Sequence, residues 1–146
     1  MAMVTGSAET VDPPQMADAP IFLIDRDDGV RDSLKVLLES YGFKVQAFAG
    51  RAEFLAKATA QPGSCLILSF NRHIVDGLDM LAALRQRRVM TPALFVVGGG
   101  NAATRASALA AGAAAYLERP VEEKTLIRAI IDALHDRGHS NSSMSA

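Results

Sequence analysis

The feature that most constrains this fold is the regular alternation of short, uninterrupted apolar runs with segments that repeat apolar residues at helical spacing. The run Ile21-Phe22-Leu23-Ile24 has no polar residue on either face, which predicts a strand buried on both sides. The next segment places apolar residues on one helical face and stops at Gly42. This unit recurs, so we expect strands at Ile21–Ile24, Phe43–Phe48, Cys65–Ser69, Pro92–Val97 and Ala113–Leu117, and helices at Val30–Tyr41, Ala52–Ala58, Leu78–Arg88, Ala102–Ala111 and Glu122–His135.

Strands that are apolar on both faces indicate a parallel sheet with helices on either side. We therefore predict a doubly wound α/β fold, with a five-stranded parallel sheet and five helices. In such a sheet, ligands bind beyond the carboxyl ends of the strands. The residues at or just beyond the predicted strand ends are Asp25, Arg26, Asp27, Ser69, Val97, Gly98 and Arg119.

The chain of 146 residues is long enough for one hydrophobic core, and we expect a single domain at 20–137. Residues 1–19 contain Pro13-Pro14 and few large apolar side chains, which predicts a flexible tail. The last helix is expected to stop at Gly138, so residues 138–146 are predicted to form a second tail.

Charge and hydropathy exclude several classes of protein. The net charge is −1 and no basic face is apparent, which argues against nucleic acid as a partner. The sequence has neither a secretory signal nor an apolar stretch that could span a membrane, and its one cysteine, Cys65, lies in an apolar run. We expect a cytoplasmic protein with no membrane contact.

Three stretches carry a resemblance to a known family: Ile24–Asp27 with Val30–Leu34, Cys65–Leu78, and Ala111–Pro120. In their order and spacing they resemble the receiver domain of two-component response regulators, in its nitrogen-fixation and NarL-like branch. The resemblance covers Pro20–Leu134. It implies a flavodoxin-like form of this fold, with strand order 2-1-3-4-5, and a role in a phosphorelay.

In that family, two carboxylates after the first strand and an aspartate ending the third strand bind magnesium, and the last of these accepts a phosphoryl group. Asp25 matches the first carboxylate, whereas Arg26 stands at the second and Ser69 at the acceptor position. Val97 replaces a hydroxyl residue, and Arg119 before Pro120 replaces a lysine. The resemblance therefore implies a degenerate pocket, with weak or absent magnesium binding, no other cofactor and no catalysis.

Several side chains near this pocket have more than one interpretation. Arg26 is either an ordinary surface residue or paired with Asp25 or Asp27 in the vacated metal position. Asp27 could replace the missing carboxylate, although neighbouring residues at a strand end point in different directions. Asp76 is predicted to cap the third helix, with no chemical role.

We expect a stand-alone pseudo-receiver that binds a histidine kinase, another response regulator or a second copy of itself. The predicted interaction face comprises the fourth helix, fifth strand and fifth helix, with Arg105, Tyr116, Glu118 and Arg128. Tyr116 also occupies the position of the family's switch aromatic, although a core tyrosine explains it equally well. The small-residue helix Ala102–Ala111, after the Gly98-Gly99-Gly100 loop, is the predicted mobile element.

Two other functions remain open. In the first, Ser69 or a nearby acidic residue is phosphorylated, although no sequence motif places a base beside Ser69 and His73 is the only candidate nearby. In the second, Arg26 and Arg119 hold a small anion in the cleft.

Overall fold

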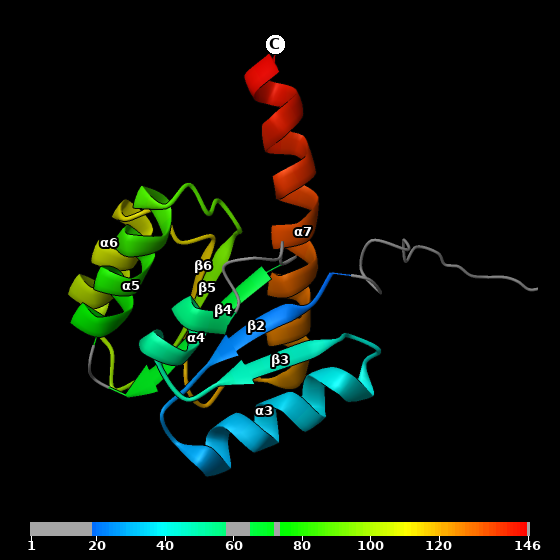
Figure 1. The fold of residues 1–146 in the computed structure, drawn as a ribbon, viewed down its shortest axis with the longest axis vertical. Helices are drawn as coiled ribbons and strands as arrows, with labels where there is room; N and C mark the ends of the chain where they lie inside the picture. Colours follow the sequence, from blue (N-terminus) through cyan, green and yellow to red (C-terminus); the bar gives the residue numbers. More distant parts are fainter. Residues whose placement is uncertain (1–18, 58–64, 72–73, 146) are drawn as a thin grey trace, which may run out of the picture.

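The structure is a computed structural model that describes residues 19–57, 65–71 and 74–145 of the chain, with side chains up to His135 except that of Ile74. The predicted N-terminal tail at 1–19 therefore lies outside the described residues, apart from Ala19. Strands and helices alternate along the chain (Figure 1). They are β2 (Ile21–Ile24), α3 (Asp28–Ser40), β3 (Val45–Phe48), α4 (Arg51–Lys57), β4 (Cys65–Asn71), α5 (Ile74–Gln86), β5 (Ala93–Gly98), α6 (Ala102–Ala110), β6 (Ala115–Glu118) and α7 (Glu123–Ser145).

The five strands form one parallel sheet in the order β3-β2-β4-β5-β6. Counted along the chain this is the order 2-1-3-4-5, so the predicted doubly wound fold is confirmed. The register is regular: Ile24 pairs with Phe48 on one side and with Leu68 on the other. The carboxyl ends of all the strands therefore meet at one edge of the sheet.

Each face of the sheet carries its own hydrophobic core. On one face, Phe22, Leu68 and Phe95 pack with residues of α4, α5 and α6, including Phe54 and Leu84. Three phenylalanines, Phe22, Phe48 and Phe54, form edge-to-face pairs in this layer. The other face packs against α3 and α7 (Figure 1), with its own set of buried residues that includes Ile21, Ile67, Leu38 and Ile130.

The ends of several elements differ from those predicted. α7 continues through Gly138 to Ser145, so the predicted helix end at that glycine is wrong. α5 begins at Ile74 rather than Leu78, which places Asp76 inside the first turn of the helix. The prediction that Asp76 is the cap of this helix is therefore wrong as well. Single-residue propensities locate element boundaries less well than the elements themselves.

The helix predicted to be mobile, α6, has Ala108 as its one fully buried residue. Its start is fixed by a capping box, in which the Asn101 side chain accepts from the amide of Thr104 and the Thr104 hydroxyl accepts from the amide of Asn101. Gly100 lies directly before this box, and a side chain there would collide with the Tyr116 hydroxyl. Little apolar burial anchors α6, but its first turn is well defined.

Candidate functional site

The carboxyl edge of the sheet brings together three of the residues predicted at the strand ends. Asp25 directly follows β2, Ser69 lies in β4, and Arg119 directly follows β6. Strand order places β4 beside β2, and the long Arg119 side chain reaches across from β6. Asp25, Ser69 and Arg119 form a hydrogen-bonded group that we call the edge network.

Asp25 lies at the centre of the edge network. Its side chain is only 5% exposed, and both carboxylate oxygens are engaged. Oδ1 accepts from the backbone amide of Asp27 at 2.8 Å, while Oδ2 accepts from the Ser69 hydroxyl at 2.5 Å. A buried carboxylate needs such partners, because an ionised group without them would carry a large desolvation cost.

Arg119 supplies the positive charge that balances Asp25. Its Nη2 lies 3.3 Å from Asp25 Oδ2 and also donates to the Ser69 hydroxyl. Its Nη1 donates to Asn71 Oδ1 at 2.5 Å and to the carbonyl of Phe70 at 3.5 Å. The planar guanidinium thus binds several acceptors at once, which a lysine ammonium at the same place would do less rigidly.

One member of this arrangement and one of its contacts were not predicted. Asn71 lies two residues after Ser69 on β4, so an extended backbone turns both side chains to the same face, and this spacing was the available signal. The sequence also gave no base beside Ser69, yet the Asp25 carboxylate contacts that hydroxyl. The earlier candidate, His73, lies outside the described residues.

Arg26 pairs with a residue outside the edge network. Its guanidinium lies 3.1 Å from the carboxylate of Asp76 in α5, and both side chains are largely exposed. Of the two interpretations of Arg26, the exposed surface side chain fits the structure, whereas the pairing with Asp25 or Asp27 does not, because Arg26 pairs with Asp76 and Asp25 with Arg119. An exposed pair of this kind contributes little to stability.

The Asp27 side chain caps a helix and is not part of the edge network. It is the N-cap of α3, and its carboxylate accepts from the amide of Val30 at 2.9 Å. Val97 lies in β5 with its side chain 1% exposed, inside the core on the α4–α6 face of the sheet. Of the six pocket residues predicted, Asp25, Ser69 and Arg119 contact one another through their side chains. Asp27 and Val97 contact this group through backbone atoms, and the Arg26 side chain pairs with Asp76 instead.

The predicted interaction face divides into exposed and buried residues. Arg105, Glu118 and Arg128 are exposed. Tyr116 is only 4% exposed and belongs to the core, with its hydroxyl 2.7 Å from Thr104 Oγ1 and 3.4 Å from Glu118 Oε2. A recess of about 490 Å³ lies on this face and includes Arg105, Tyr116 and Glu118 among its walls. Tyr116 therefore forms the base of the surface.

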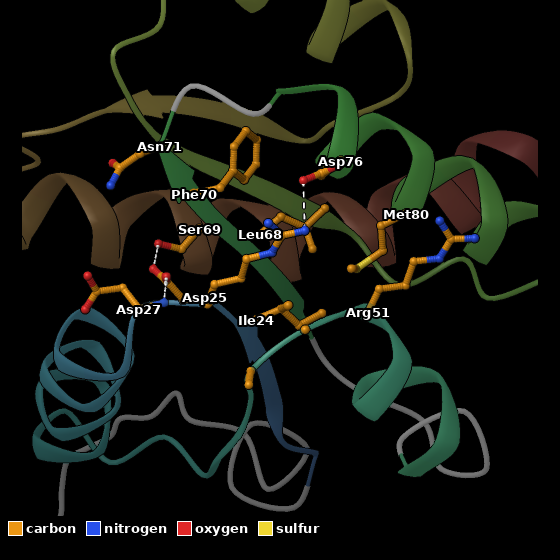
Figure 2. Close-up of a pocket in the computed structure, with 14 residues that line it drawn as sticks. Ile24, Asp25, Asp27, Arg51, Leu68, Ser69, Phe70, Asn71, Asp76 and Met80 are labelled. Carbon is orange, nitrogen blue, oxygen red and sulfur yellow. Dashed lines mark hydrogen bonds and ion pairs between the residues drawn. The ribbon is translucent and has the colours of Figure 1, made fainter.

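A second cavity opens between the loops that follow β2, β3 and β4 (Figure 2). Its volume is about 430 Å³, within the range of small-molecule sites. Apolar side chains form much of its wall, and they are Ile24, Leu68, Phe70 and Met80. Arg26, Arg51 and Asp76 also line it, whereas Arg119 does not.

The sheet order and the charged side chains at its carboxyl edge define a flavodoxin-like α/β domain of the receiver class. Comparison with known families agrees. The chain belongs to the response regulator receiver domain family, whose pattern matches residues 21–131. Receiver domains of this family are signalling modules of two-component systems.

Individual relatives support the same assignment. The transcriptional regulatory protein FixJ of Azorhizobium caulinodans is 32% identical over 111 residues, which is 76% of this chain and 53% of that protein. TdiR of Thauera aromatica is 32% identical over 133 residues, which is 91% of this chain and 54% of that protein. The crystal structure of FixJ-N superposes with a TM-score of 0.73 at 27% identity, covering 81% of this chain and 94% of that one. The chain spans about half the length of these curated relatives.

Two other features bear on the kind of site. Across the described ranges, no three His, Cys, Asp or Glu side chains cluster closely enough to hold a metal ion. In the same part of the chain, no helix combines the length and apolar character needed to cross a membrane.

Proposed function

We propose that this chain is a pseudo-receiver, a non-catalytic domain that works in a cytoplasmic phosphorelay by protein contact and without aspartyl phosphorylation. The observation that carries the proposal is the edge network. At the acceptor position of β4 stands Ser69, and its hydroxyl is enclosed between Asp25 and Arg119. There is no carboxylate at that position to attack a phosphoryl group.

The fit of magnesium also supports the proposal. A hard divalent cation needs several oxygen ligands. Asp25 is the one carboxylate of the edge network, and the guanidinium of Arg119 is already paired with it. Asp27 uses its carboxylate to cap α3. A cation approaching Asp25 would also meet repulsion from Arg119, so these residues do not fit the ion.

Intact mass spectrometry tests the proposal directly. The full chain is incubated with acetyl phosphate and magnesium, beside a conventional receiver domain that shows the donor to be active. We expect the mass of this chain to stay unchanged while that of the control rises by one phosphoryl group. A phosphoryl group mapped to Asp25, Asp27 or another acidic residue of the pocket would refute the proposal.

Phosphorylation of Ser69 is the second candidate, and one contact favours it: Asp25 Oδ2 lies 2.5 Å from the Ser69 hydroxyl, in the position of a base. Against it, Ser69 is only 3% exposed, and Arg119 also contacts the hydroxyl. The same incubation with Ser69→Ala decides between them. A mass increase that this substitution abolishes would favour the second candidate.

An anion held jointly by Arg26 and Arg119 has less support. Arg26 pairs with Asp76, whereas Arg119 pairs with Asp25. Of these two arginines, Arg26 lines the cavity between the β2, β3 and β4 loops and Arg119 does not. The two guanidiniums therefore belong to separate groups of side chains.

For the partner we propose a histidine kinase, another response regulator or a second copy of this chain, and not nucleic acid. The surface proposed for this contact carries Arg105 and Glu118 in the wall of the 490 Å³ recess, together with the exposed Arg128 of α7. Reversing two of these charges, with Arg105→Glu and Arg128→Glu, should slow association without changing the thermal midpoint. Sedimentation of the full chain tests the homodimer. An association constant unchanged by both substitutions would exclude this face.

A further inference from the structure

We infer that the 430 Å³ cavity beside β2 and β4 is a binding site for a small carboxylate with a compact apolar body. One wall of the cavity is apolar, because Ile24, Leu68 and Met80 are core residues that line it. Phe70, partly buried at the end of β4, adds an aromatic wall. Such a surface favours an apolar group of a ligand over water.

Three carboxylates and two guanidiniums line the cavity, and their existing partners decide which of them is available to a ligand. Each of the three carboxylates already accepts a hydrogen bond from the protein: Asp25 from Ser69, Asp27 from Val30, and Asp76 from Arg26. Arg51, at the start of α4, is different. Among the described residues it has neither an ion pair nor a side-chain hydrogen bond, and it is exposed. The available group is therefore a guanidinium.

A guanidinium binds a carboxylate through two parallel hydrogen bonds. Figure 2 shows the Arg51 side chain on the same side of the cavity as Met80, so one ligand can contact both. Arg26 offers a second donor, because its pair with Asp76 is solvent-exposed and weak enough for a ligand carboxylate to compete with. The apolar wall and the Arg51 guanidinium, which has no partner among the described residues, together favour an amphipathic monoanion.

This inference does not depend on whether the chain is phosphorylated, so the two proposals can fail separately. The test is calorimetric titration of the full chain with three probes that share one aromatic body: phenylacetate, phenylethanol and phenethylamine. Acetate is added as a head group without a body. We expect phenylacetate to bind about tenfold more tightly than each of the others, as expected for one charge-assisted contact.

Two substitutions of exposed arginines distinguish a direct contact with Arg51 from a general effect of the protein's charge. Arg51→Gln should reduce phenylacetate affinity about tenfold, to the level of phenylethanol. The matched control is Arg87→Gln, beyond the end of α5 and outside the cavity, which should leave the affinity unchanged. Both sites are exposed, so neither change is expected to unfold the protein.

The location of the probe is read by nuclear magnetic resonance. We expect contacts between the phenyl protons and the methyl groups of Ile24, Leu68 and Met80. Three outcomes would overturn the inference: no binding of phenylacetate at millimolar concentration, phenethylamine binding as tightly as phenylacetate, or phenyl contacts to methyl groups elsewhere.

Discussion

At the scale of single residues, Arg119 has the most consequential contacts in this structure. It neutralises a buried carboxylate, contacts the hydroxyl at the acceptor position of β4 and binds Asn71. Its backbone is tied to β5 as well, since its amide donates to the carbonyl of Val97 at 2.9 Å. One side chain thus joins the ends of β2 and β4 to the loop after β6.

Replacing Arg119 should therefore destabilise the protein. In Arg119→Ala the Asp25 carboxylate stays buried without its counter-charge, and we expect a loss of about 2–3 kcal/mol in the free energy of unfolding. Urea denaturation measures it. The control is Arg26→Ala, which breaks only the exposed pair with Asp76 and should cost less than about 1 kcal/mol. Equal losses in the two variants would contradict this interpretation.

Cys65 gives a prediction about pH. Complete burial raises the pKa of its thiol to about 12, because the thiolate would have to form in the core. The unfolded chain ionises first as the pH rises, so the contribution of this group to stability is present below the thiol's ordinary pKa and is lost as the pH rises toward 12. At pH 9, iodoacetamide should label the native protein far more slowly than the urea-unfolded protein. Similar rates would show that the thiol is accessible.

At the scale of elements, the ends of the helices are fixed by short-range polar contacts. Asp27 caps α3, and Asn101 with Thr104 forms the capping box of α6. The capping contacts should contribute a larger share of the stability of α6 than of α3, because Ala108 is the one buried residue of α6. In the loop before it, the Tyr116 hydroxyl leaves no room for a side chain at Gly100.

The role of Asp27 can be tested by two substitutions. Asp27→Ala removes the acceptor for the Val30 amide and should cost about 1 kcal/mol. Asp27→Asn keeps a capping oxygen and should stay close to the wild-type stability. Thermal or urea unfolding measures both. If Asp27→Asn were as unstable as Asp27→Ala, the negative charge itself would be what matters.

The contact between Gly100 and Tyr116 calls for a double-mutant cycle. A Cβ at position 100 would overlap the Tyr116 hydroxyl, so Gly100→Ala should push this ring out of its place in the core. Tyr116→Phe removes the obstructing oxygen. We therefore expect Gly100→Ala to cost about 1 kcal/mol less in the Tyr116→Phe background, measured by urea unfolding. Additive effects would mean that the loop moves instead.

At the scale of the whole molecule, one sheet separates two cores, and the polar groups gather at its carboxyl edge. Figure 1 shows the same division, with α7 on the opposite side from α5 and α6 and running on past the sheet. The edge network holds together the ends of strands that are far apart in sequence. A ligand or partner at this edge would contact several elements at once.

Magnesium should leave the stability of the whole protein unchanged. An ion that binds the folded state raises the thermal midpoint, so we expect no shift for this chain at millimolar magnesium. The matched variant combines Arg26→Asp, Ser69→Asp and Arg119→Lys, which restores the family's residue types at these positions. Calorimetry should show a magnesium-dependent rise for the variant alone. A comparable rise for the unmodified chain would contradict the proposed loss of the metal site.

The sequence by itself determined the five strands, the parallel sheet and most of the residues at its carboxyl edge, because apolar periodicity is a local property that each segment carries. Only the tertiary structure decided which charges pair. Asp25 and Arg119 are 94 positions apart, and Arg26 and Asp76 are 50 apart. Such pairs depend on how loops from different strands pack and where each side chain then points, and no local pattern specifies that.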